Sequence, residues 1–289
     1  MKFAYFPGCS LHSTAKEYDA STKFVCGRLG IELVEIPNWV CCGATPIHRT
    51  NALASIALPA KNLLWAQTEN LPVAAPCSEC FSRLKLANLE VAENEELKKN
   101  VSEVLGETYE GNVDIYHLPQ VIIEKIGLKE IEKKVAKKLS GLKIASYYGC
   151  LLTRPPKVAT FDRIEDPQFL DNLVLSLGAE SVNWAYKTEC CGATFSLSKK
   201  ELVLKLTNDI LQNAYDEKAD CIMVACPLCH SNLDLRQKEV EKKYKVKYNL
   251  PVFYFTQLIG LSMGADIRGL GLKRHMVSAE KLLSSKGLI

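Results

Sequence analysis

Short apolar runs alternate with longer amphipathic stretches from the start of the chain. Residues 2–7, 31–36 and 71–75 are short runs of mainly apolar side chains, which is typical of buried strands. Residues 14–29 and 51–67 instead carry apolar side chains at helical spacing. Strands that alternate with helices predict parallel β-α-β units, because parallel neighbours need a crossover connection.

The same order of elements returns in the second half of the chain, which indicates a duplication. We expect an α/β protein with two pseudo-symmetric, Rossmann-like halves, residues 1–140 and 141–289, each with a parallel sheet. A lysine-rich helix over 129–139 is the expected connector. The second-half strands are expected at 142–148, 180–186 and 221–225, its helices at 167–177 and 199–217, and a late strand and helix at 252–264 that match 113–127.

Ten of the twelve cysteines form one motif that occurs in both halves. Each copy has a single cysteine, then Cys-Cys-Gly, then Cys-x-x-Cys, and 34 residues separate the Cys-Cys pair from the Cys-x-x-Cys pair in both copies. Chance repetition of so many fixed positions is implausible, so the motif supports the duplication. The first cysteine set is Cys9, Cys41, Cys42, Cys77 and Cys80, and the second cysteine set is Cys150, Cys190, Cys191, Cys226 and Cys229.

Each part of this motif follows a predicted strand. In the first half, Cys9, Cys41 and Cys77 come after the first, second and third strands. The carboxyl ends of parallel strands meet at one edge of a sheet, where open α/β folds bind ligands. We therefore expect five thiols to gather at one edge in each half.

Five thiols gathered at one edge favour an iron–sulfur cluster, and the same residues are also compatible with zinc. Thiolates suit both, but a structural zinc ion and an ordinary cubane cluster each take four ligands. The fifth cysteine suggests an unusual cluster, with zinc in one or both halves as the alternative. A thioredoxin-type pair at Cys77 and Cys80 would leave both Cys-Cys pairs unexplained. Cys26 and Cys221 lie outside the motif and are expected to be buried core thiols.

Composition and charge argue against several other classes of function. A net charge of +3 gives no reason to expect a nucleic-acid partner. No apolar run reaches the length of a membrane-spanning helix, and the apolar part of the chain start is too short for a signal peptide, so we expect a cytoplasmic protein. No Gly-x-Gly-x-x-Gly fingerprint follows a strand, so we expect neither flavin nor nicotinamide in this chain, and electrons must come from a partner protein.

The duplicated motif resembles the CCG-domain proteins, and its completeness in both halves is similar to the B subunit of the heterodisulfide reductases. The similarity covers essentially the whole chain. The resemblance implies a noncubane [4Fe-4S] cluster in each half, held by the five matched cysteines, with the two clusters facing each other across the pseudo-twofold axis. It also implies cleavage of a disulfide such as that of coenzyme M and coenzyme B.

The same resemblance implies partner proteins. These are a ferredoxin-like C subunit and a flavin-containing A subunit, linked to a hydrogenase or a formate dehydrogenase. Methanogen B subunits often carry Cys-Cys-Pro in the first half, whereas this chain has Cys41-Cys42-Gly43. The natural disulfide is therefore left open.

Disulfide reduction takes two electrons and two protons, so two one-electron centres on either side of one disulfide fit the chemistry. His48, six residues after Cys42, is a candidate for proton delivery, and His230 directly follows Cys229. Arg154 is a candidate for holding an anionic part of the substrate. Further basic candidates for that role are Arg49, Lys199 and Lys273.

Three other functions remain possible from the sequence. The chain could be a subunit for electron transfer or membrane docking, as in the succinate dehydrogenase relatives that carry a similar CCG pair. It could belong to a lactate- or glycolate-oxidising complex, although the second-half cysteines there are often degenerate and both Cys-x-x-Cys pairs are intact here. It could also be a zinc-bound scaffold without redox activity.

Overall fold

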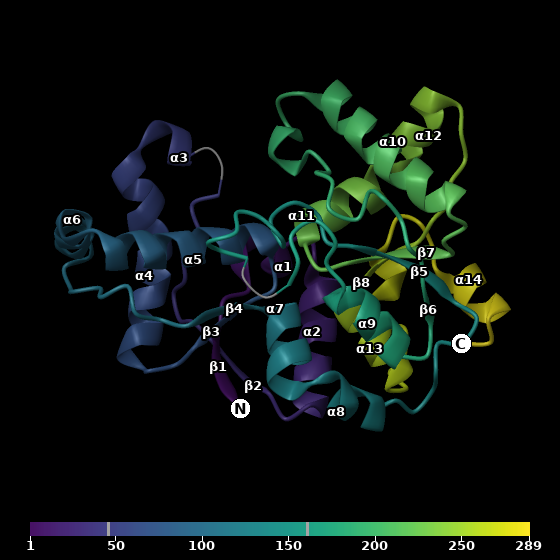
Figure 1. Cartoon of the computed structure of the whole chain (residues 1–289), viewed down its shortest axis with the longest axis horizontal. Coiled ribbons are helices and arrows are strands. Elements are labelled where there is room, and N and C mark those ends of the chain that lie inside the picture. The colour runs from purple at the N-terminus through teal and green to yellow at the C-terminus, as the bar shows by residue number, and fades with distance from the viewer. Residues whose placement is uncertain (45–46, 160–161) are drawn as a thin grey trace.

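Two four-stranded parallel sheets form the centre of the protein (Figure 1). The computed structural model describes residues 1–44, 47–159 and 162–289. The strand order is β2-β1-β3-β4 in the first sheet and β6-β5-β7-β8 in the second sheet, so the two sheets share one topology. This confirms the α/β class with two Rossmann-like halves. The strands are β1 (Lys2–Tyr5), β2 (Glu32–Glu35), β3 (Val73–Ala75) and β4 (Ile115–His117) in the first sheet, and β5 (Lys143–Tyr147), β6 (Glu180–Ser181), β7 (Cys221–Val224) and β8 (Val252–Tyr254) in the second.

Helices connect the strands, as β-α-β crossovers require. Strands such as β3, β7 and β8 are buried along their whole length, which explains their continuous apolar runs. The first half contains α1 (Gly8–His12), α2 (Lys16–Arg28), α3 (Ile47–Thr50), α4 (Ala52–Thr68), α5 (Ser78–Glu93), α6 (Glu95–Leu105), α7 (Leu118–Gln120), a π-helical turn over Val121–Ile126, and α8 (Leu128–Lys133). The second half contains α9 (Phe169–Ser176), α10 (Lys200–Asp216), α11 (Pro227–His230), a π-helical turn over Ser231–Leu235, α12 (Gln237–Tyr244), α13 (Phe255–Ser262) and α14 (Glu280–Ser285).

Two predicted elements are much shorter than expected. The connector helix ends at Lys133, because the backbone amides of Ala136 and Lys137 donate to the carbonyl of Ser262 at 2.8 and 2.9 Å and draw the chain onto the second half. The strand predicted over 180–186 stops at Ser181. The residues that follow turn inward, and the Trp184 indole donates to the carbonyl of Ser146 at 3.0 Å.

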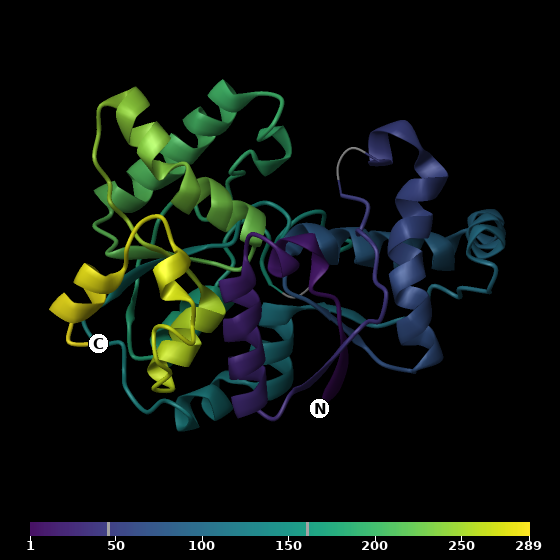
Figure 2. The same ribbon diagram turned by 180° about the vertical axis from the view of Figure 1, so that it is seen from behind.

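Helices α2 and α13 join the two halves. They lie side by side in both ribbon views (Figures 1 and 2), and the Ser21 and Thr256 hydroxyls form a buried hydrogen bond of 2.7 Å between them. Beside this contact, the Arg274 Nε donates to Glu17 Oε2 at 3.1 Å. The halves are therefore packed through a buried interface and are not separate units on a linker.

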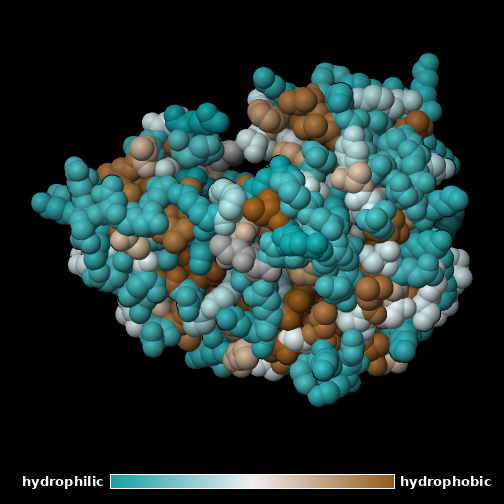
Figure 3. Space-filling model, viewed as in Figure 1, coloured by the Kyte–Doolittle hydropathy of each residue, from teal (hydrophilic) through white to brown (hydrophobic). Residues whose placement is uncertain are grey.

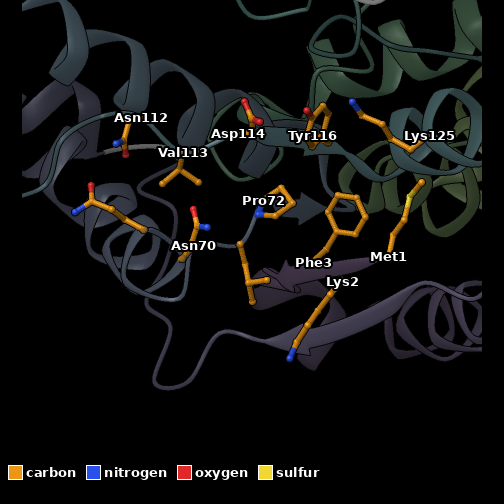
Figure 4. Close-up of a pocket in the computed structure, with 13 residues that line it drawn as sticks. Met1, Lys2, Phe3, Asn70, Pro72, Asn112, Val113, Asp114, Tyr116 and Lys125 are labelled. Atoms are coloured by element: carbon orange, nitrogen blue, oxygen red, sulfur yellow. The ribbon is translucent and has the colours of Figure 1, made fainter.

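A groove of about 560 Å³ opens at the amino ends of β1, β3 and β4, at the opposite edge of the first sheet from the cysteine motifs (Figure 4). Its lining includes Phe3 and Asp114, and Lys125 lies 4.4 Å from the Tyr116 ring centroid. A second groove of about 550 Å³ lies before β7 and β8 in the second half, and most of its lining comes from α14 and the residues just before it. The two grooves are therefore lined by different elements, and neither lining includes a motif cysteine.

The face shown in Figure 3 is mostly hydrophilic, with hydrophobic residues in small groups. Among the described residues, no helix combines the length and the apolar character needed to cross a lipid bilayer.

Candidate functional site

Both cysteine sets lie at the carboxyl edges of the sheets. Cys9 lies in α1 immediately after β1, and Cys77 and Cys226 are the N-cap residues of α5 and α11. Cys150 follows β5 after a short turn. Cys9, Cys41 and Cys190 are exposed and Cys150 is half-buried, whereas the remaining motif cysteines are buried. Each set is therefore anchored in the core and open to solvent on one side.

In the first set, three thiols share hydrogen bonds around Cys42. The thiols of Cys41 and Cys80 donate to the Cys42 sulfur and lower its pKa to about 3, with a further contribution from the Arg83 guanidinium. The same hydrogen bond raises the pKa of Cys41, as do burial and the nearby Cys9 sulfur. The network therefore favours a thiolate, which is the form of cysteine that binds metals.

The second set is held in the same way. The Cys150 thiol and the Gly192 amide, which lies 3.3 Å from the Cys190 sulfur, lower the pKa of Cys190 to about 6. The sulfurs of Cys191 and Cys229 lie 3.6 Å apart. Hydrogen bonds from Cys229 and Cys77 hold the pKa of Cys226 well below its usual value, although burial opposes them.

The two sets meet at Cys77 and Cys226. These residues come from different halves, and their thiols form a hydrogen bond to each other. Cys77 caps α5 and Cys226 caps α11, so helix amides face both sulfurs, which favours negative charge there. The ten thiols thus form two groups in direct contact across the interface between the halves.

Glycines keep space free beside the sulfurs. Gly8 and Gly149 precede the first cysteine of each set and have φ values of +70° and +66°. A Cβ at Gly8 would lie 3.0 Å from the Cys80 sulfur, and one at Gly149 would lie 3.3 Å from the Cys229 sulfur. An all-thiol donor set with cleared space beside it fits a group that sulfur ligands hold, such as an iron–sulfur cluster.

The sulfurs are not arranged around one point. In the described part of the chain, no three His, Cys, Asp or Glu side chains converge closely enough to hold a single metal ion. They form pairs and short chains of hydrogen-bonded thiols instead.

Glu79 is a site residue that the sequence interpretation missed. It lies between Cys77 and Cys80, and it lines a small cavity of about 40 Å³ together with the second cysteine set. Burial and the nearby sulfur of Cys226 raise its pKa to about 7. The corresponding second-half residue is Leu228, on the same cavity. The signal available in the sequence was this carboxylate inside one of the two Cys-x-x-Cys pairs.

The two predicted catalytic residues differ in their placement. Arg154 lies near Cys190, whose pKa its charge lowers, and its guanidinium is 3.4 Å from the Thr188 carbonyl. His48 lies on α3, and its buried Nδ1 has no hydrogen-bond partner among the described residues. His230 is buried and its Nε2 is 3.0 Å from the Val252 carbonyl, so it packs in the core.

The remaining candidates are at the surface or in the core. Arg49, Lys199 and Lys273 are exposed. Cys26 and Cys221 are buried core thiols, as expected, and burial raises the pKa of Cys26 to about 12.

Comparison with known proteins agrees with this geometry. A family profile described as the cysteine-rich domain, CCG, matches residues 3–85 and again residues 144–234. The chain belongs to the CCG cysteine-rich domain family. Its two matched regions contain the two cysteine sets and confirm the duplication.

Two groups of relatives of this CCG protein cover nearly its whole length. It is 34% identical over 97% of its length to the 8-methylmenaquinol:fumarate reductase membrane anchor subunit of Wolinella succinogenes, covering 99% of that protein. It is 29% identical over 98% of its length to the B subunit of the ferredoxin:CoB-CoM heterodisulfide reductase of Methanosarcina mazei, covering 96% of that protein. The expected resemblance to the heterodisulfide reductase B subunits is thereby confirmed.

A solved structure supports the fold. A hypothetical protein from Helicobacter pylori superposes with a TM-score of 0.76 over 96% of this chain, at 14% identity. This chain spans about half, 52%, of that protein.

Proposed function

We propose that this chain is the disulfide-reducing iron–sulfur subunit of a heterodisulfide reductase-type complex, with one noncubane [4Fe-4S] cluster on each cysteine set. The observation that supports it is the meeting of two complete five-cysteine sets at Cys77 and Cys226. Two equivalent cysteine sets in contact across one interface suit a reaction in which two electrons are added to a single bond.

The ligands in this proposal are the ten motif cysteines. Such clusters, when bound, supply electrons one at a time. The chain itself contributes the thiolate-favouring hydrogen bonds and the helix amides at Cys77 and Cys226, which stabilise negative charge. The Glu79 carboxyl lines the cavity beside the second set, where its Oε atoms can pass a proton to a leaving thiolate.

Arg154 and His48 keep the roles suggested by the sequence as part of the proposal. Arg154 is close enough to Cys190 to attract an anionic part of a disulfide substrate. His48 would deliver protons from the α3 side of the first set. Positively charged side chains and proton donors are both common in active sites where a substrate acquires charge during the reaction.

The proposed partners are a ferredoxin-like C subunit and a flavin-containing A subunit, with a hydrogenase or formate dehydrogenase behind them. The support is the 29% identity to the B subunit of a heterodisulfide reductase. The disulfide of coenzyme M and coenzyme B is the first substrate to assay. The domain boundary at residue 140 and the cytoplasmic location stay predictions.

A second candidate is an electron-transfer subunit of a quinol-linked dehydrogenase or reductase. It is favoured by the 34% identity to the membrane anchor subunit of a methylmenaquinol:fumarate reductase. In this function, the two cysteine sets would pass electrons between a partner protein and a membrane quinone, and no disulfide would be consumed.

One experiment tests both candidates. The chain is purified without oxygen, and iron, acid-labile sulfide and zinc are quantified, with about eight iron and eight sulfide expected. Reduced viologen dye is then offered with a panel of disulfides or with a soluble menaquinone analogue. Disulfide-dependent dye oxidation supports the reductase, and oxidation with the quinone alone supports the second candidate. Zinc without sulfide would overturn both.

A further inference from the structure

One buried hydroxyl connects the two Cys-x-x-Cys motifs. Tyr18, on α2, is fully buried, and its hydroxyl oxygen lies 3.1 Å from the carbonyl of Pro76 and 3.1 Å from the carbonyl of Ala225. Pro76 directly precedes Cys77, and Ala225 directly precedes Cys226. A single hydroxyl proton is therefore shared between the backbone of the first half and the backbone of the second half.

The Tyr18 ring is itself held by the second half. It stacks on Tyr254 with a centroid distance of 4.1 Å and an interplanar angle of 6°, and it meets Phe255 edge-on at 6.2 Å. One turn further along α2, Ser21 hydrogen-bonds to Thr256 at 2.7 Å. The ring thus has little freedom to turn its hydroxyl away from the two carbonyls.

These contacts bear directly on the place where the cysteine sets meet. The thiols of Cys77 and Cys226 hydrogen-bond to each other, and the two carbonyls that Tyr18 binds each lie one residue before these cysteines. Interfaces between halves of a chain allow small relative shifts unless specific contacts fix them. A contact shared by both strand ends resists such a shift at the site itself.

We infer that Tyr18 is a positioning residue that sets the separation of the Cys77 and Cys226 sulfurs, and through them the separation of the groups that the two cysteine sets hold. The second part rests on the proposed function, whereas the first part concerns the protein chain alone. The separation of two redox centres controls how fast they exchange electrons, so the residue would affect the reaction without touching the substrate.

The test uses Tyr18→Phe, which removes the hydroxyl and keeps the stacked ring. The metal-free full-length chain is treated briefly with diamide, a diazene that takes up two electrons and two protons as two thiols join in a disulfide. Mass spectrometry measures the ratio of the Cys77–Cys226 disulfide to the Cys191–Cys229 disulfide. The second pair lies within one half, with its sulfurs 3.6 Å apart, and serves as the internal reference.

The Tyr18 variant is expected to lower this ratio roughly fivefold, the effect of losing one hydrogen bond of ordinary strength. Tyr109→Phe is the matched control, because Tyr109 is also fully buried and donates to Asn88 within the first half. Ser21→Ala controls for looser packing between α2 and α13. Both controls should keep the parent ratio. An unchanged ratio in the Tyr18 variant, or an equal fall in Ser21→Ala, would overturn the inference.

A second measurement uses the iron-loaded protein. Electron paramagnetic resonance of the fully reduced chain should show a weaker spin–spin interaction in Tyr18→Phe than in Tyr109→Phe, with equal iron content. An unchanged spectrum together with a lowered disulfide ratio would refute the effect on the bound groups. If the chain carries no clusters, the proposed function fails, and the disulfide ratio still decides the role of Tyr18.

Discussion

Replacing Gly8 by alanine is expected to remove iron from the first cysteine set and leave the second set loaded. Gly8 has a φ of +70°, and an added Cβ would lie 3.0 Å from the Cys80 sulfur. This approach is closer than ordinary van der Waals contact, so the sulfur must move by a few tenths of an ångström. The left-handed backbone costs alanine a further ~1–2 kcal/mol.

Gly106→Ala is the matched control, because Gly106 has a φ of +76° and no atom within 4 Å of the added Cβ. Both variants carry the same backbone strain, but only the Gly8 variant displaces a sulfur. Both proteins are purified without oxygen, and iron, acid-labile sulfide and urea unfolding are measured. We expect about four iron in the Gly8 variant and about eight in the control.

The free energy of unfolding of the metal-free proteins should fall by roughly 1–2 kcal/mol in the Gly106 control and by somewhat more in the Gly8 variant. Full iron content in the Gly8 variant would refute the idea that this glycine clears space for a bound group. Equal iron loss in both variants would show that backbone strain alone, and not the position of the Cys80 sulfur, explains the effect.

Three further predictions concern single side chains. Cys226→Ala should lose about half the iron and nearly all disulfide-dependent turnover. The control Cys221→Ala, which changes a buried core thiol, should keep its iron and its turnover. Substantial turnover in Cys226→Ala would contradict a two-centre reaction. Glu79→Gln should keep full iron and lower the turnover number by roughly 10²-fold or more, the usual effect of a lost proton donor, and an unchanged rate in dye-linked assays would exclude that role. Burial lowers the pKa of His275 to about 3. Below about pH 6.5, the imidazole is therefore protonated in the unfolded chain while it stays neutral in the folded chain. The contribution of His275 alone should therefore lower the free energy of unfolding by up to about 2 kcal/mol between pH 6.5 and pH 5, and urea titrations of His275→Gln should show a correspondingly smaller fall than the parent.

The cysteine geometry could be predicted from the sequence because the motif repeats and because parallel strands end at one edge. Cys9, Cys77, Cys150 and Cys226 each follow a strand that the apolar pattern alone identifies. Local patterns were less informative where tertiary contacts decide the outcome. The connector helix stops at Lys133 because Ser262, far along the chain, binds the amides that follow.

Contacts between the halves could not be predicted from the sequence. The Tyr18 hydroxyl meets the carbonyl of Ala225, which is 207 residues away, and no spacing rule relates these positions. Glu79 was missed for a similar reason, because its significance comes from the second-half cysteines around it and not from its own motif. The pairing of Cys77 with Cys226 likewise depends on how two separately predictable sheets pack together.

The difference between Glu79 and Leu228 has a consequence for the history of the chain. Two identical halves assembled as a homodimer would carry the same side chain at both positions, so a carboxylate inside one Cys-x-x-Cys pair would also be present in the other. In one continuous polypeptide each copy mutates on its own. Gene fusion thus lets a carboxylate and a leucine occupy equivalent positions of the two motifs, so the two cysteine sets of one chain have different chemical surroundings.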